Sequence, residues 1–132
     1  MKIKCKEVEG YQFSRKDVRE GITNRVKHRG LTKEKSYVVY GMTICQEGLD
    51  YLIYDDYEMP MWYSADLFEI EDSLLPNNWH HSFWGYDEHG ITAIWGYSEL
   101  AKSQKHFDGL AEQNEEDVEL FVKRKKETDE AI

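Results

Sequence analysis

Short stretches of alternating hydrophobic and polar residues in the first 72 positions predict half-buried β-strands. The predicted strands are residues 2–6, 37–45, 51–54, 61–63 and 68–71. Turn residues at 46–48 and at 55–60 divide the middle three strands into hairpins, and a proline at the second turn interrupts strand pairing there. Ser64 is predicted to cap a single helical turn just before the last strand.

The remaining segments are less regular. Residues 10–30 predict a long polar connection that is rich in basic side chains. Residues 79–86 form an aromatic connector, and residues 91–95 predict a sixth short strand. Two helices are expected after it, the first capped by Ser98 with an apolar face that includes Leu100 and Leu110. The second is capped by Asn114, and a narrow apolar stripe around Phe121 is expected to dock on the body of the protein.

Together these elements predict one α+β domain over residues 1–132. Five short strands within about 70 residues, with one helical turn before the last strand, are typical of a small, strongly bent antiparallel barrel. The arrangement resembles a Src-homology-three-like barrel over about residues 1–72, followed by the connector, the extra strand and two C-terminal helices over about 73–132. This architecture hosts many unrelated functions, so the fold alone names none.

Composition narrows the class of protein. With 132 residues, 40% hydrophobic and 14% aromatic, the chain can bury a real core, which argues against disorder. Cys5 and Cys45 belong to no closely spaced pair and are expected to be reduced thiols. The basic start lacks an apolar signal region, and no apolar stretch approaches the length of a membrane span, so a cytoplasmic protein is predicted.

Charge is strongly segregated along the chain. Residues 1–35 carry a net charge of +6, residues 36–101 carry −12, and residues 102–132 carry −3. The middle segment, which we call the cation-free segment, has twelve carboxylates, no lysine or arginine, and 14 of the 18 aromatic residues. An acidic, aromatic surface attracts basic proteins and repels phosphate backbones, so we expect a basic protein partner and no nucleic acid.

The acidic turn between the third and fourth predicted strands is the candidate centre of such a surface. Carboxylates there would steer a basic partner, and adjacent aromatic side chains would supply contact area. The candidate partner-binding residues are Asp55, Asp56, Glu58, Trp62 and Tyr63. The alternatives are that the turn is only solvated and that Trp62 belongs to the core.

Metal and catalytic motifs are not convincing in this sequence. The acidic turn lacks the spacing of a calcium loop, and His80, His81 and His89 lack the tight ligand pairs of structural zinc, so no metal and no cofactor are expected. No nucleophile motif or phosphate-binding loop occurs. An alternative hypothesis is a small-ligand enzyme in which His80 or His81 acts as acid–base in a pocket of the aromatic connector. Glu69 and Glu71 are interpreted as solvated residues of an edge strand.

Several segments together resemble a family of small, uncharacterised bacterial proteins of immunity-protein type. They are residues 35–42, 51–56, 60–63, 67–70, 75–76 with 79, 95–100 and 121–125. The resemblance implies a compact binding protein and transfers no catalytic residue. Our first hypothesis is therefore an immunity-like inhibitor, monomeric or homodimeric, that binds a basic toxin domain through the acidic, aromatic surface. A phage or plasmid accessory scaffold is the further alternative.

Overall fold

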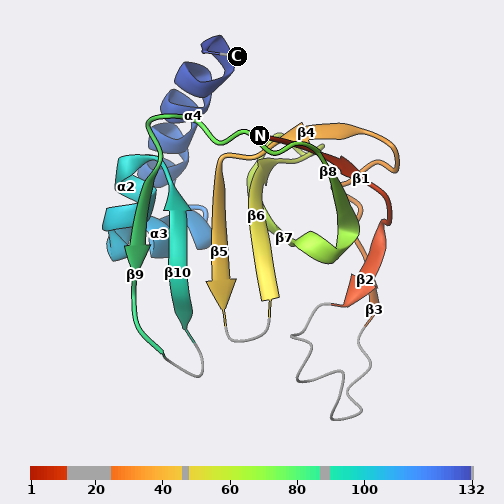
Figure 1. Ribbon diagram of the computed structural model, residues 1–132, viewed down its shortest axis with the longest axis horizontal. Helices are drawn as coiled ribbons and strands as arrows, with labels where there is room; N and C mark the ends of the chain where they lie inside the picture. The colour runs from red at the N-terminus through yellow and green to blue at the C-terminus, as the bar shows by residue number, and fades with distance from the viewer. Residues whose placement is uncertain (12–24, 46–47, 87–89, 132) are drawn as a thin grey trace.

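The computed structural model describes residues 1–11, 25–45, 48–86 and 90–131 as an α+β fold with antiparallel sheets (Figure 1). The strands are β1 (Lys2–Cys5), β2 (Glu9–Tyr11), β3 (Arg25–Lys27), β4 (Ser36–Val38), β5 (Gly41–Cys45), β6 (Gly48–Tyr54), β7 (Pro60–Ser64), β8 (Phe68–Asp72), β9 (His80–Phe83) and β10 (Ile91–Gly96). The helices are the 3-10 turn η1 (Ala65–Leu67), α2 (Ser98–Lys102), α3 (Gln104–Ala111) and α4 (Glu115–Glu130).

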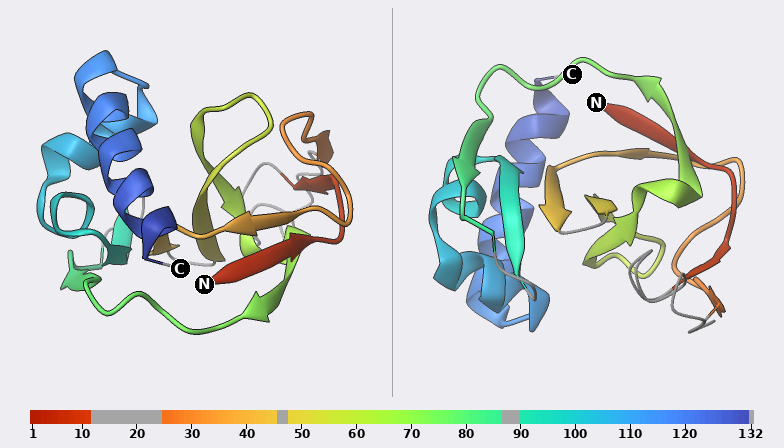
Figure 2. Two further views of the ribbon diagram at one scale, coloured as in Figure 1. Left: turned by 90° about the horizontal axis from the view of Figure 1, so that it is seen from above. Right: turned by 60° about the horizontal axis from the view of Figure 1, so that its bottom comes forward.

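Three sheets organise the described residues. The large sheet has the strand order β7-β6-β5-β10-β9, the small sheet has the order β4-β1-β8, and β2 pairs with β3. Seen from above, the helices lie on one side of the molecule and β1 and β4 lie on the other, with the large sheet between them (Figure 2). The helices and antiparallel sheets confirm the predicted α+β class. None of these sheets closes on itself among the described residues, so the predicted barrel is not confirmed.

The large sheet buries apolar side chains on both of its faces. The sheet-side core lies toward the small sheet and consists of Ile3, Cys5, Leu31, Tyr37, Val39, Tyr51, Ile53, Tyr63 and Leu67. The helix-side core consists of Tyr40, Leu52, Ile94, Tyr97, Leu100, Ala101, Leu110 and Phe121. Strand β6 serves both cores, because successive side chains of a strand point to opposite faces. A strand buried on both faces needs an almost unbroken apolar run, which residues 51–54 supply.

The predicted continuous strand over residues 37–45 is wrong: it is two strands in two different sheets. β4 pairs with β1, and β5 pairs with β6 and β10. The backbone N–H of Val39 donates to Met1 O at 3.0 Å, whereas that of Tyr40 donates to Leu52 O at 2.8 Å. The chain therefore crosses from the small sheet to the large sheet between these two residues, and their side chains enter opposite cores.

The first predicted C-terminal helix is also two elements. It breaks at Ser103, whose hydroxyl accepts a hydrogen bond from the backbone N–H of His106 at 3.1 Å and so caps α3. The residue that caps α2 is Tyr97 and not Ser98. Asn114 does occupy the N-cap position of α4, although its side chain makes no capping hydrogen bond.

Some of the other predictions are confirmed by the structure and some are not. Ser64 caps η1 by accepting from the backbone N–H of Asp66 at 3.4 Å, and the sixth strand is confirmed as β10. The aromatic connector contains a strand, β9, which the sequence did not predict. The polar connection over 10–30 contains β3 and part of β2, while residues 12–24 and the turn residues 46–47 lie outside the described residues.

Both cysteines are free thiols. Cys5 is fully buried in the sheet-side core, and burial raises the pKa of its thiol, whereas Cys45 is half-buried. No helix in the described part of the chain has the length and apolar character needed to cross a membrane.

Candidate partner-binding turn

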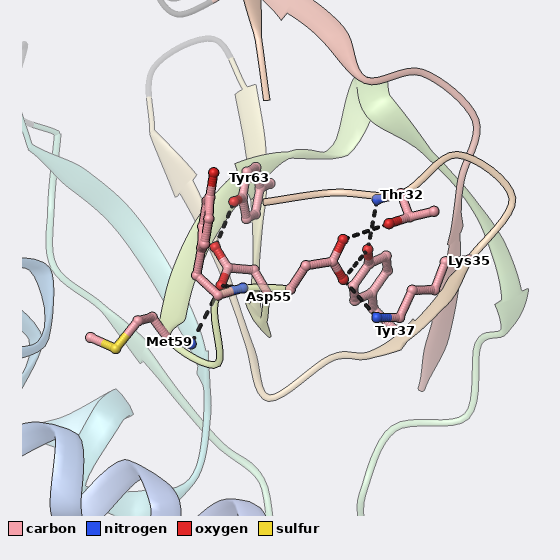
Figure 3. A network of polar contacts seen from close by, with 8 residues as sticks. Thr32, Lys35, Tyr37, Asp55, Met59 and Tyr63 are labelled. Atoms are coloured by element: carbon pink, nitrogen blue, oxygen red, sulfur yellow. Dashed lines mark hydrogen bonds and ion pairs between the residues drawn. The ribbon is translucent and has the colours of Figure 1, made fainter. Parts of the chain in front are cut away.

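The acidic turn joins β6 to β7 and is held together by one buried carboxylate. Asp55 Oδ1 accepts hydrogen bonds from the backbone N–H groups of Tyr57 at 3.0 Å and Met59 at 3.3 Å, and its Oδ2 accepts from the Tyr63 hydroxyl at 2.8 Å (Figure 3). The backbone N–H of Asp55 also donates to Met59 O at 3.0 Å. Aspartate favours such positions because its short side chain can accept from backbone groups two residues on.

The next carboxylate ties the turn to the segment that precedes β4. Asp56 Oδ1 accepts from Lys35 Nζ at 2.6 Å and from the Tyr37 hydroxyl at 2.9 Å, and its Oδ2 accepts from the Thr32 hydroxyl at 2.6 Å (Figure 3). The Tyr37 hydroxyl in turn accepts from the backbone N–H of Thr32 at 2.9 Å. Three donor groups from residues 32–37 therefore converge on the Asp56 carboxylate.

Burial and hydrogen bonding shift the protonation of these groups in opposite directions. Burial, reinforced by the neighbouring carboxylates, raises the pKa of Tyr63 and raises that of Tyr37 to about 12. Burial alone would raise the pKa of Asp56, but the hydrogen bonds from Lys35, Thr32 and Tyr37 outweigh it and lower that pKa. Around neutral pH, Asp56 is therefore ionised and both tyrosines are neutral donors.

Gly30 permits this close packing. Its backbone carbonyl accepts from the N–H of Asp56 at 2.9 Å. A Cβ atom at this position would lie 2.5 Å from the Tyr63 hydroxyl oxygen and 2.6 Å from Asp55 Oδ2. A side chain at position 30 would therefore collide with the Tyr63 hydroxyl and the Asp55 carboxylate.

The part of the turn that reaches solvent is its tip. Tyr57 is 64% exposed and Glu58 is exposed as well. Glu58 has a φ of 59°, in the left-handed region that a residue with a Cβ adopts only at a cost. Backbone strain of this kind is found preferentially at binding and active sites, so the conformation of Glu58 draws attention to the tip.

The two aromatic residues predicted beside the turn point to opposite sides of the large sheet. Tyr63 is buried in the sheet-side core, while Trp62 packs on the helix side with its ring 5.7 Å from that of Phe107. The indole Nε1 of Trp62 is buried and has no hydrogen-bond acceptor among the described residues. The structure thus brings Asp55, Asp56 and Tyr63 together, and it separates Trp62 from them.

The cation-free segment has no lysine or arginine of its own, but four of its described carboxylates are paired with cations from elsewhere in the chain. Lysines and an arginine from outside the segment pair with Asp56 (Lys35, 2.6 Å), Glu69 (Lys6, 3.9 Å), Glu71 (Lys4, 3.6 Å) and Glu99 (Arg124, 2.7 Å). These contacts join residues that lie far apart in sequence. Periodicity within one segment carries no signal for them.

The histidines of the alternative enzyme hypothesis lie on β9. His80 and His81 are both exposed, and the ring of His81 stacks on Trp95 at a centroid distance of 4.7 Å. His89 lies outside the described residues. Within residues that the structure describes, no three His, Cys, Asp or Glu side chains come together in an arrangement that could hold a metal ion.

A buried polar chain that sequence reasoning missed lies on the helix side. The Tyr97 hydroxyl is 2.7 Å from His106 Nε2, and His106 Nδ1 is 2.8 Å from Asp117 Oδ1. Tyr97 and His106 are both buried, and neither lies in a recognisable motif. These hydrogen bonds link the residue after β10 to α3 and α4, so they fix the packing of the helices.

Comparison with known proteins adds no assignment to this geometry. No protein-family model, no curated protein and no solved structure matches this chain significantly.

Proposed function

We propose that this protein is a non-enzymatic acidic binding protein whose partner is a basic protein. One observation carries the proposal: every strand of the large sheet belongs to the cation-free segment, so the sheet contains no lysine or arginine. Its strands present aromatic and apolar side chains, and the adjoining acidic turn supplies carboxylates, a combination that steers and then binds basic surfaces. Neutralisation of a toxin domain is the form of this function that the resemblance to immunity-type proteins suggests.

We also propose that the small sheet and strands β5 to β7 together make a Src-homology-three-like half-barrel. The pairing of β1 with both β4 and β8, the crossing at Val39 and the turn η1 before β8 support it, since these are the features expected of a strongly bent barrel. The enclosed residues are those of the sheet-side core.

The acidic turn remains the proposed contact region, with its parts in different roles. Tyr57 and Glu58 would contact the partner, because they form the exposed tip. Asp55 and Tyr63 would position the tip from beneath, because they are buried and bonded to each other. Asp56 would contribute to steering, although Lys35 reduces its share of the negative potential.

The test is capture of the partner from the native host at low salt, followed by association kinetics with the purified partner. We expect a basic polypeptide whose association rate falls as salt is raised. Glu58→Gln should slow association and flatten the salt dependence, whereas Glu9→Gln, which removes an exposed carboxylate of β2 outside the cation-free segment, should not. Association that does not depend on salt, or a neutral or acidic partner, would refute the proposal.

A further inference from the structure

The face of the large sheet that lies opposite the helices is only partly covered. Strands β6 and β7 send Tyr51, Ile53 and Tyr63 into the sheet-side core beneath the small sheet. Strands β9 and β10 lie beyond it, at the left of Figure 1, with α2 and α3 against their other face. Phe83 is 57% exposed on this uncovered side, and Ile44 of the adjacent strand β5 is exposed too.

The strand register arranges the side chains on this side of the sheet in two rows. Trp95 stands between Met42 of β5 and His81 of β9, and Ala93 stands between Ile44 and Phe83. Directly paired residues of antiparallel strands project to the same face, so Met42, Ile44, His81, Phe83, Ala93 and Trp95 share one side of the sheet. We call His81, Phe83, Tyr86, Trp95 and Ile44 the aromatic face; none of these residues is an aspartate, a glutamate, a lysine or an arginine.

Gly85, which lies between Trp84 and Tyr86, has a left-handed backbone conformation. Gly85 has a φ of 97°, a conformation that favours glycine. On one side of it, Trp84 packs edge-on against Phe107 at 5.6 Å in the helix-side core. On the other side, Tyr86 meets Phe83 edge-on at 5.2 Å while remaining 90% exposed. Tyr86 therefore packs on another exposed ring and not in either core.

The aromatic face ends at an unprotected sheet edge. Exposed edges are normally guarded by charges, prolines or bulges, because their free backbone groups can pair with another strand. β8 carries the exposed carboxylates Glu69 and Glu71, and β7 begins with Pro60. β9 has the sequence His-His-Ser-Phe and pairs with β10 on one side only, as far as the structure describes the chain.

We propose that an extended basic segment of the partner adds as a strand to the free edge of β9 and lays arginine or lysine side chains on the aromatic face. This inference rests on the proposed function and adds a second contact region, at the edge of the large sheet opposite β7 and the acidic turn. The occupant is identified by charge: the chain has a net charge of −9, and the large sheet carries no cation that would repel a basic strand. Guanidinium and ammonium groups bind to the faces of tryptophan, tyrosine and phenylalanine rings, while main-chain pairing at a sheet edge supplies affinity.

A fluorescent peptide of alternating arginine and threonine is the probe, measured by anisotropy with the full chain. We expect it to bind, and we expect the same peptide with alternate backbone amides N-methylated, or with glutamate in place of arginine, to bind at least roughly tenfold more weakly. The double variant Phe83→Ser with Tyr86→Ser should also lose roughly tenfold in affinity without a change in melting temperature, since both rings are exposed. Leu74→Ser, which removes an apolar side chain that is 77% exposed outside this face, is the matched control and should bind normally.

Equal binding of the N-methylated peptide would overturn strand addition, and equal binding by the double variant would overturn the aromatic face as the site. No binding of the arginine peptide at all would overturn both. The proposed function has a separate readout, because it fails if no basic protein with salt-dependent association is captured from the host. If the captured partner dissociates equally fast from wild type and from the double variant, the proposed function stands and this docking mode fails.

Discussion

The two faces of the large sheet bury a tyrosine hydroxyl in two different ways. On the sheet side, the Tyr63 hydroxyl donates directly to the carboxylate of Asp55, eight residues earlier in the same hairpin. On the helix side, the Tyr97 hydroxyl reaches Asp117 through the imidazole of His106. Burial raises the pKa of both tyrosines, so both hydroxyls stay protonated at neutral pH.

This difference separates contacts within one hairpin from contacts that join separate elements. The sheet-side carboxylate satisfies backbone groups of its own turn, so it fixes the shape of the proposed contact region. The helix-side hydrogen bonds from Tyr97 through His106 to Asp117 connect the end of β10 to α3 and α4, so they fix how separate elements pack. Damage on the helix side should therefore spread through the fold, and damage on the sheet side should be concentrated at the turn.

The largest effect is expected from Phe121→Ala. Phe121 is fully buried on the helix side, with its ring 5.4 Å from Tyr40 and 6.1 Å from Tyr54. Its truncation should cost about 4 kcal/mol of unfolding free energy, measured by urea denaturation. The neighbouring exposed residue provides the control, since Val122→Ala should cost less than about 1 kcal/mol. Equal losses in the two variants would show that α4 does not dock through Phe121.

Asp55→Ala is expected to have the next largest effect, about 3 kcal/mol, because it leaves the buried hydroxyl of Tyr63 and two backbone N–H groups without acceptors. Asp56→Ala is the matched change one residue later and should cost about 1 kcal/mol, since the Asp56 side chain is partly exposed. Amide exchange should also accelerate at Tyr57 and Met59 in Asp55→Ala but not on the helix side. Faster amide exchange in both regions would show that the loss of Asp55 is not confined to its turn.

The ion pair of Glu99 with Arg124 should make the helix side sensitive to acid. The Arg124 guanidinium lowers the pKa of Glu99 from 4.5 to about 2. Because the folded pKa lies below the unfolded one, the pair stabilises the fold above about pH 4.5, and this stabilisation is lost as the pH falls toward about 2. Both side chains are partly exposed, so the effect should be roughly 1 kcal/mol.

Glu99→Gln is the variant that checks this pH dependence. It should be less stable than wild type at neutral pH, and the difference should vanish near about pH 2. Lys123→Gln, on an exposed position of α4, serves as the control and should show the same pH dependence as wild type. A constant difference between Glu99→Gln and wild type at every pH would contradict the assignment.

The smallest effect is a gain. Glu58→Gly should raise the unfolding free energy by about 0.5 kcal/mol, because glycine adopts the left-handed conformation without steric cost. Glu34→Gly is the comparison: Glu34 also has a positive φ, of 70°, but it pairs with Lys6 at 3.0 Å, so its gain should be smaller. A destabilised Glu58→Gly variant would mean that the Glu58 side chain contributes to the fold.

Much of the sheet-side region could be predicted from the sequence, because its hairpin and turns depend on local residue types. The signal that Asp55 points inward was also present. Tyr51, Ile53 and Asp55 are spaced by two, and the first two are core residues of one strand face. A carboxylate that continues this spacing lies on the same face unless the strand has already ended.

The remaining features depend on how separate elements pair and pack. An apolar run such as residues 37–45 does not reveal a change of sheet, because both halves are equally suited to a strand. β9 was missed because His-His-Ser-Phe has no apolar alternation and owes its structure to pairing with β10. The link from Tyr97 through His106 to Asp117 joins elements whose packing no single periodic pattern specifies.

The crossing at Val39 and Tyr40 also makes the molecule indivisible. The described residues form two cores, but β4 belongs to the small sheet and β5, directly after it, belongs to the large sheet. Cutting the chain between them would therefore divide the sheet-side core between the two pieces. β8 returns to pair with β1 only after β5, β6 and β7 have been laid down. A fragment ending after Asp72 would therefore expose β5 as a bare edge, and we expect it to aggregate where the whole chain folds.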